Sequence, residues 1–320
     1  MDSWQSGAAV ESLRKKAEII GEIRQYFREK GVMEVQTPLI TRLPSIDPLI
    51  EPFRLPVSTN ETRYLITSPE HHMKRLLCQG SGSIYQIAPA FRQAESGHIH
   101  NPEFLMLEWY RVGMGMDGLM DETGELLDRV FGCGKGEVIS YRELFYNETG
   151  LDPFESGLDQ WQDFLGQLKT PVPEALCREA TPVWEILDYV MGFILQPKLQ
   201  GQKPLFVKGF PISRGQLAQS DPKDEKTALR FEVYLKGVEL ANGYQELTCP
   251  EEQQRRFHQA NLQRKEIGLE ALPVDIRLQK ALEKGLPLCS GIALGLDRLI
   301  MLALGKERID EVLSFSWERS

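Results

Sequence analysis

Carboxylates crowd the segment from Arg230 to Leu247. The dipeptide Lys236-Gly237 is typical of a two-residue hairpin turn, which would place Tyr234 opposite Glu239. Glu232 then becomes a diagonal neighbour of Glu239 on the same face, ~7–8 Å away and within reach of long side chains. Two acidic groups held this close could share a metal ion or an amine.

A second turn signal, Asn242-Gly243, follows in the same segment. A turn there would bring Glu246 directly opposite Glu239, so that three carboxylates lie on one face of a sheet. Directly opposed like charges destabilise a sheet, and a cation must compensate them. Magnesium, an amine substrate or both would serve. The alternative is a solvated face with a looser register.

Four other side chains are candidates for chemistry. Arg92 could clamp phosphate, since a guanidinium is always charged and binds in a bidentate manner, or it is a surface cation. Phe104 could stack on a base or belong to the core. Glu108 lies among apolar neighbours, where a carboxylate needs a partner. Arg298 begins an apolar helix, a place that suits phosphate, or it is a surface residue.

The elements that must position these residues follow from periodicity. Apolar spacing predicts a helix over residues 12–30, and alternation predicts antiparallel strands over residues 83–91 and 103–112. The segment PLFVKGF (204–210) predicts a buried strand, and SGIALG (290–295) predicts a strand that leads into a helix. Hairpin-linked strands favour an α/β (α+β) fold with an antiparallel sheet flanked by helices over a doubly wound parallel sheet.

Composition narrows the class of protein. The chain has 320 residues, 42% of them hydrophobic, which is enough for a sizeable core in one large domain or two. Lys and Arg number 37 against 46 Asp and Glu, a formal charge of −9 that disfavours nonspecific nucleic-acid binding. The sequence has no G-x-G-x-x-G and no G-x-x-x-x-G-K-[ST] loop.

The cysteines and the N-terminal residues indicate the compartment. Five cysteines without C-x-x-C spacing disfavour a disulfide framework and a zinc knuckle. The first residues lack the apolar core of a signal peptide, and no run approaches a membrane span of ~20 apolar residues. We therefore expect a cytoplasmic protein with no membrane partner.

Three separated blocks together resemble the class II aminoacyl-tRNA synthetases. GVMEVQTPLI (31–40) is similar to motif 1, FRQAESGHIHNPEFLMLEWY (91–110) to motif 2 and GIALGLDRLIML (291–302) to motif 3. Their order and the segment RFEVYLKGVELANGYQEL resemble the lysyl subgroup. The resemblance covers nearly the whole chain. It implies one catalytic domain over residues 1–320 with a helical insertion around 113–200, and a homodimer formed through motif 1.

Two features set the chain apart from a lysyl-tRNA synthetase. Motif 1 begins near residue 31, so we expect no anticodon-binding domain, and tRNA is a doubtful substrate. Ser68 in TSPE and Ala293 in GIALG replace a small apolar residue and a glycine. Both features resemble the family of truncated paralogues that attach (R)-β-lysine, through an adenylate, to a lysine of elongation factor P. The cofactors implied are ATP and Mg²⁺.

The resemblance also implies roles for individual residues. Arg92 would hold the α-phosphate and Arg298 the terminal phosphate, and Glu232 and Glu239 would ligate magnesium. The nucleotide site would further include Gln93, Ala94, His100, Asn101, Phe104, Glu239, Leu240 and Gly295. The amino acid would be surrounded by Ser68, Pro69, Glu70, Glu108, Tyr110, Asn242, Glu246 and Ala293. Several carboxylates suit a substrate with two ammonium groups.

One departure from the family pattern bears on activity. The family carries Arg-Asn-Glu where this chain has Arg92-Gln93-Ala94. Glu95 either replaces the missing carboxylate or a nucleotide contact is lost. Two rival functions stay open: a stand-alone ligase that makes an α-lysyl adenylate for another acceptor, and a catalytically weak regulatory paralogue. Retention of Arg92, Glu232, Glu239 and Arg298 speaks against the second rival.

Overall fold

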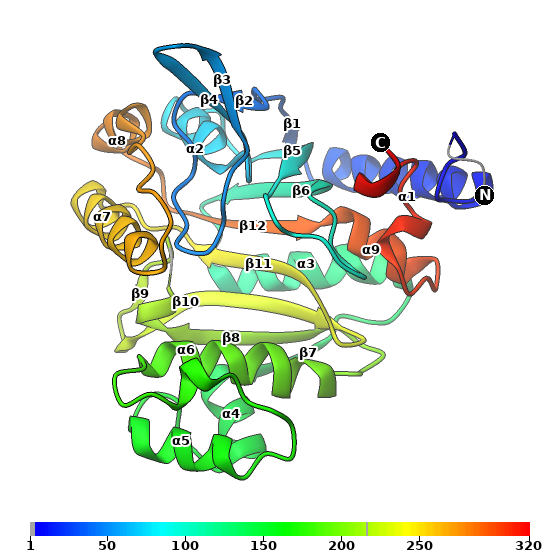
Figure 1. The fold of residues 1–320 in the computed structure, drawn as a ribbon. Coiled ribbons are helices and arrows are strands. Elements are labelled where there is room, and N and C mark those ends of the chain that lie inside the picture. The colour runs from blue at the N-terminus through cyan, green and yellow to red at the C-terminus, as the bar shows by residue number, and fades with distance from the viewer. Residues whose placement is uncertain (1–3, 216) are drawn as a thin grey trace. The chain divides into compact units, whose positions relative to one another are not determined.

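The structure, a computed structural model, describes residues 4–215 and 217–320. It divides into two compact units, which Figure 1 shows in the colours of the chain. Unit 1 comprises the chain up to Gly132 together with Glu246–Ser320, and unit 2 comprises Cys133–Gln245. The organisation as one domain with a helical insertion stays a prediction.

Three antiparallel strands form the centre of unit 1. Strand β5 (Ile84–Phe91) pairs with β6 (Glu103–Val112), and β6 pairs in turn with β12 (Cys289–Gly295). The short strand β1 (Met33–Glu34) lies parallel to β5 at the edge. The register of β5 and β6 runs without a shift, so the predicted hairpin and its antiparallel pairing are confirmed.

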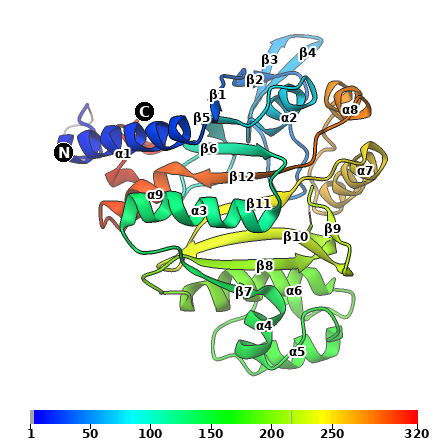
Figure 2. The same cartoon turned by 180° about the vertical axis from the view of Figure 1, so that it is seen from behind.

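Helices cover one face of these strands. Phe27 of α1 (Val10–Glu29) stacks on Tyr85 and makes an edge contact with Trp109. The Trp109 indole donates a hydrogen bond of 3.1 Å to Glu122 of α3 (Met116–Phe131). Figure 2 shows α1 and α3 on this side of β6 and β12. Because side chains alternate along a strand, the neighbours of Trp109 point to the opposite face.

The remaining elements of unit 1 form a small sheet and further helices. The small sheet has the order β2 (Ile40–Thr41), β4 (Glu61–Leu65), β3 (Arg54–Ser58). The helices are α2 (Glu70–Cys78), α7 (Pro250–Glu266), α8 (Ile276–Glu283), α9 (Leu296–Ala303), η5 (Ile309–Glu311) and η6 (Trp317–Arg319).

Unit 2 has its own antiparallel strands and its own core. Strand β10 (Asp224–Leu235) pairs with β8 (Leu205–Pro211), β9 (Ser220–Asp221) and β11 (Val238–Gln245), and β7 (Glu137–Ser140) lies parallel to β8. The helices are α4 (Tyr141–Thr149), α5 (Leu158–Gly166), η1 (Glu174–Cys177), α6 (Val183–Tyr189), the π-helical turn η2 (Val190–Leu195), η3 (Gln196–Lys198) and η4 (Ile212–Arg214). Buried aromatic rings of Tyr141, Phe145 and Trp161 fill the space between them.

One predicted turn of unit 2 is confirmed and the other is wrong. Lys236 and Gly237 connect β10 to β11, and both have positive φ angles, 51° and 76°, as a two-residue hairpin turn requires. Asn242 and Gly243 instead lie inside β11, paired with Glu232 and Phe231. The long partner strand β10 supplies hydrogen bonds through this position, so β11 does not turn back there and Glu239 does not face Glu246. The predicted pairing of Tyr234 with Glu239 is confirmed.

The hydropathy of the helices bears on membrane association. None of the helices in the described part of the chain combines the length and the apolar character that crossing a bilayer demands.

Candidate active site

The open face of the unit 1 strands carries the predicted amino-acid residues. Glu108 and Tyr110 stand two positions apart on β6 and therefore share the face turned away from α1 and α3. Across the strand pairs, Ala293 of β12 lies opposite Glu108 and Gly291 opposite Tyr110. The register of the strands thus brings together residues that are about 180 positions apart in the sequence.

Glu108 is buried, and its carboxyl group is bonded on both oxygens. Ser68 Oγ donates to Oε2 at 2.6 Å, and the Tyr110 hydroxyl donates to Oε1 at 2.7 Å. Burial, together with the negative charge of Glu70, raises the pKa of Glu108 to about 8. The group is therefore poised to ionise when a cation arrives beside it.

Ser68 and Pro69 fix the entry to helix α2. The backbone N–H of Glu70 donates to Ser68 Oγ at 3.0 Å, and Pro69 occupies the N-cap with a φ of −75°. Ser68 Oγ thus accepts from Glu70 and donates to Glu108, which links two acidic residues of the predicted site. An apolar residue at position 68 could make neither of these two hydrogen bonds.

Lys74 is a residue of this cluster that the sequence analysis missed. Its ammonium lies 2.6 Å from Glu70 and 2.6 Å from Glu246, and the lysine side chain is fully buried. The two carboxylates raise the pKa of Lys74 far enough to outweigh burial, and Lys74 holds the pKa of Glu70 below its ordinary value. The pKa of Glu246 is raised to about 7 because its own burial outweighs the ammonium.

Glu70, Glu108 and Glu246 therefore gather as predicted, but with an internal cation between two of them. The four-residue spacing of Glu70 and Lys74 on a helix was the available signal. It was not sufficient, since exposed pairs with this spacing are common on helices.

Gly291 is the second residue that the sequence analysis missed. A β-carbon at this position would overlap with Glu246 Oε1 and with the ring of Tyr110. Only glycine allows both side chains to approach β12 so closely. Gly291 therefore shapes the site through the absence of a side chain.

Gln86 is the third. It lies opposite Glu108 on β5, is 2% exposed, and its Oε1 accepts no hydrogen bond from any of the described residues. A buried carbonyl oxygen without a donor is costly, so it indicates a ligand that can donate. Gln86 adds a neutral acceptor to the same face as the carboxylates.

A cationic cluster occupies the other end of the same strands. The guanidinium of Arg92 lies over the ring of Phe104, 5.2 Å from its centroid, and the backbone N–H of Arg92 donates to the Pro102 carbonyl at 2.9 Å. Arg298 Nε donates to the Ile99 carbonyl at 3.2 Å. A guanidinium carries five N–H donors in a planar fork, a geometry that suits phosphate.

His100 lies within electrostatic range of both arginines. Burial lowers the pKa of His100, and the positive charges of Arg298 and Arg92 lower it further. At neutral pH the ring is therefore neutral and can accept or donate a hydrogen bond near a nucleotide. Gly295 is the N-cap of α9, and a β-carbon there would be in ordinary contact with the side chain of Arg298, 3.4 Å from Cδ.

The loop after Arg92 has an unusual conformation. Ala94 has a φ of 64°, a left-handed geometry that L-residues other than asparagine and aspartate rarely adopt. Glu95 lies 3.6 Å from Arg92, and Gln93 donates its N–H to the Glu51 carbonyl at 2.8 Å. The carboxylate missing at position 94 thus has a neighbour within range of the same arginine.

Asn101 is engaged within the protein. Its amide nitrogen donates to the Glu103 carbonyl at 2.5 Å, and its oxygen accepts from the Trp317 N–H at 2.9 Å. The side chain therefore ties the C-terminal turn to the start of β6. A direct nucleotide contact of Asn101 would need one of these bonds to open.

In unit 2, an irregularity in β11 arranges the remaining predicted residues. Val233 pairs with Ala241 and Tyr234 with Glu239, so Leu240 is an extra residue in β11. This β-bulge puts Glu239 and Asn242 on one face, although their spacing of three would separate them in a regular strand. Glu232 shares that face because it pairs with Asn242.

The Glu232 carboxylate accepts hydrogen bonds from the guanidinium of Arg230 and from the hydroxyl of Tyr234. Asn242 Oδ1 accepts from Arg230 Nε at 3.2 Å. Across the described ranges no cluster of three or more His, Cys, Asp or Glu side chains is arranged to hold a metal ion. Magnesium is commonly held by one or two carboxylates plus substrate phosphates. Two glutamates, Glu232 and Glu239, on one face of a hairpin fit that donor set.

Comparison with known proteins adds an independent result. The family model described as class II tRNA synthetases (D, K and N) matches residues 2–319. A protein from Pectobacterium atrosepticum named elongation factor P–(R)-β-lysine ligase is 43% identical over 99% of this chain and 98% of its own length. Proteins of the same name from Vibrio atlanticus and Edwardsiella ictaluri are 42% and 43% identical, each over at least 99% of both chains.

Proposed function

The chain belongs to the class II tRNA synthetase family and, within it, to the elongation factor P–(R)-β-lysine ligases, and we propose that it performs their reaction. It activates (R)-β-lysine with ATP and joins it to a lysine of elongation factor P. The observation that carries this proposal is the buried acidic cluster of Glu70, Glu108 and Glu246 around Lys74.

The charge of this cluster matches a diammonium substrate. Three carboxylates and one ammonium leave two negative charges when every group is ionised. Without a ligand, burial keeps Glu108 largely protonated at neutral pH, which avoids the free-energy cost of a buried carboxylate without a cation. A substrate with two ammonium groups restores the ionised carboxylate and balances both charges. Gln86 Oε1 supplies a further acceptor on the same face.

The first half-reaction needs little covalent participation by the protein. The substrate carboxylate attacks the α-phosphorus of ATP, a carboxyl–phosphate anhydride forms, and pyrophosphate leaves. Arg92 stabilises the charge that develops on the α-phosphate, Arg298 binds the terminal phosphate, and Phe104 stacks on adenine. For stacking, the Arg92 guanidinium must move off the Phe104 ring, which it covers in the structure.

Magnesium would be held by Glu232 and Glu239 in unit 2. It would neutralise phosphate charge when bound. In the structure the guanidinium of Arg230 pairs with the Glu232 carboxylate, so a metal ion would share this carboxylate with Arg230 or displace it.

In the second half-reaction the ε-amine of the acceptor lysine attacks the carbonyl carbon of the adenylate. The amine loses a proton, an amide forms and AMP leaves. The raised pKa values of Glu108 and Glu246 place two carboxyl groups in the range where they could exchange protons at neutral pH.

The experiment that tests the proposal is mass spectrometry of elongation factor P after incubation with the chain, ATP, Mg²⁺ and either lysine isomer. We expect one lysyl group added from (R)-β-lysine and almost none from α-lysine. Addition of α-lysine only would indicate the opposite isomer preference, and addition of neither isomer while pyrophosphate exchange proceeds would indicate another acceptor. No exchange with either isomer would indicate a regulatory paralogue.

We also propose that the chain forms a homodimer through residues 31–40, a segment in which Met33 and Ile40 are each 50% exposed. Light scattering of the purified protein tests this proposal. A chain that is monomeric at micromolar concentration would contradict it.

A further inference from the structure

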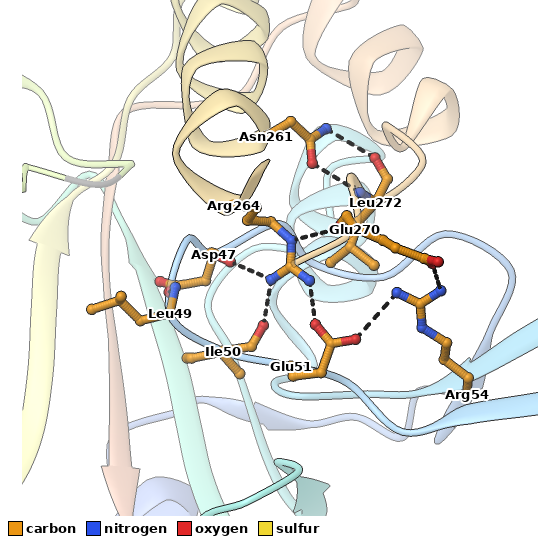
Figure 3. A network of polar contacts seen from close by, with 9 residues as sticks. All are labelled: Asp47, Leu49, Ile50, Glu51, Arg54, Asn261, Arg264, Glu270 and Leu272. Carbon is orange, nitrogen blue, oxygen red and sulfur yellow. Dashed lines mark hydrogen bonds and ion pairs between the residues drawn. The ribbon is translucent and has the colours of Figure 1, made fainter. Parts of the chain in front are cut away.

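A buried arginine outside the predicted site organises the segment before β3. Arg264 belongs to the last turn of α7 and is 0% exposed. Figure 3 shows its guanidinium enclosed by the chain segment from Asp47 to Glu51 and by the turn at Glu270. All of these residues belong to unit 1.

The guanidinium makes four polar contacts. Nε donates to the Glu270 carbonyl at 2.9 Å, and one terminal nitrogen donates to the carbonyls of Asp47 at 3.0 Å and Ile50 at 2.9 Å. The other terminal nitrogen pairs with the carboxylate of Glu51. A buried charge is tolerated only when it is bonded in this way. Arginine suits the position because its donors form a planar fork.

Two neighbouring contacts reinforce the network. Arg54 pairs with Glu51 at 3.2 Å and also with Glu270. The side-chain amide of Asn261 donates to the Leu272 carbonyl at 2.9 Å and accepts from the Leu272 N–H at 2.8 Å. These two hydrogen bonds fix the turn after α7. Figure 3 shows both contacts beside Arg264.

Glu51 connects this network to the nucleotide loop. Its side chain is bound by Arg264, while its backbone carbonyl accepts from the N–H of Gln93 at 2.8 Å. Gln93 follows Arg92 directly and precedes Ala94, the residue with the left-handed backbone. The position of Glu51 therefore constrains the chain at the point where it leaves β5 and presents Arg92.

We infer that Arg264 is a positioning residue for the ATP-binding loop, acting through Glu51 on Gln93. This inference rests on the proposed function, because it takes Arg92 to bind the α-phosphate. None of these polar contacts of Arg264 is with a residue assigned to ATP or to the amino acid. Its effect is to hold one end of the loop, so that Arg92 does not have to be ordered when ATP binds.

The test uses the full chain with Glu51→Gln and Arg264→Lys. Glu51→Gln keeps the backbone bond to Gln93 but removes the charge that Arg264 binds. Arg264→Lys keeps the charge but cannot reproduce the fork. Glu252→Gln is the matched control, since Glu252 pairs with Arg255 and Arg256 on the same helix and touches neither loop.

Two readouts separate positioning from general destabilisation. Pyrophosphate exchange should show KM for ATP raised about 10-fold in both variants with KM for the amino acid unchanged. Hydrogen–deuterium exchange should show faster exchange at residues 91–95 as well as 47–51. The control should leave both readouts at the wild-type level.

Faster exchange at residues 47–51 alone, with residues 91–95 and KM for ATP unchanged, would overturn the inference. The hydrogen-exchange readout needs no activity. If the unaltered chain catalyses no pyrophosphate exchange, the proposed function fails, whereas exchange at residues 91–95 still decides whether Arg264 holds the loop.

Discussion

The ammonium of Lys74 lies 2.6 Å from the carboxylate of Glu246, and both side chains are withdrawn from solvent. This ion pair joins helix α2 to the residue that follows β11. It also shares its cation with Glu70. The consequence is a site that contains one positive charge of its own and must accommodate the substrate around it.

Lys74→Met tests how much this cation contributes to the stability of the fold. Removal leaves Glu70 and Glu246 without compensation, and we expect a loss of about 3–5 kcal/mol in the free energy of unfolding. Urea denaturation at pH 7 measures it. The control is Lys306→Met, since Lys306 pairs with Glu311 at 3.4 Å on the surface and should cost at most about 1 kcal/mol. Equal losses in the two variants would contradict this account.

Glu108 predicts a specific pH dependence. Its pKa is about 8 in the folded protein and near 4.5 when it is exposed, so the folded state binds the extra proton between these values. Stability should therefore fall as the pH rises from about 4.5 to about 8 and then level off. Glu246, with a pKa of about 7, contributes in the same direction. Glu108→Gln should flatten the slope between pH 7 and 8.

Urea titrations at several pH values measure this slope, and Glu283→Gln on the exposed surface of α8 is the matched control. Binding of a diammonium substrate should also release a proton from Glu108 at pH 7. Calorimetry in buffers of different ionisation enthalpy detects that proton. An enthalpy independent of the buffer would count against an ionising carboxyl in the site.

Gly291→Ala tests whether the site depends on close packing over β12. The new methyl group would overlap with Glu246 and Tyr110, so both side chains must shift. We expect KM for the amino acid in pyrophosphate exchange to rise at least 10-fold, with KM for ATP little changed. Gly21→Ala, in helix α1 where a methyl group meets open space, is the control. An unchanged KM for the amino acid would contradict the assignment of this face.

Ala293→Gly tests isomer selection. Ala293 lies directly opposite Glu108, so its methyl group occupies space on the face assigned to the amino acid. Its removal should raise activation of α-lysine relative to (R)-β-lysine, because one methyl group in a pocket is worth ~1–3 kcal/mol. Pyrophosphate exchange with both isomers measures the ratio. An unchanged ratio would show that another residue sets the preference.

Local patterns were sufficient for much of the fold. Alternation predicted β5 and β6, the segment SGIALG predicted β12, and Lys236-Gly237 predicted its hairpin, since these signals depend only on neighbours in the chain. The turn at Asn242-Gly243 was wrong because pairing to β10 outweighs a local turn preference. Lys74 and Gln86 escaped prediction for a different reason: a sequence does not show which polar side chains are buried.

The bulge at Leu240 has a consequence for how this segment tolerates change. It shifts the alternation of side chains midway along β11. Before the bulge, the odd-numbered Glu239 lies on the face of Glu232, and after the bulge the even-numbered residues such as Asn242 lie on it. Deleting Leu240 would restore a regular strand in which Glu239 and Asn242 are two positions apart and therefore still share one face. Among related chains we therefore expect this strand either with the bulge or one residue shorter, with the acidic residue and the asparagine on the same face in both forms.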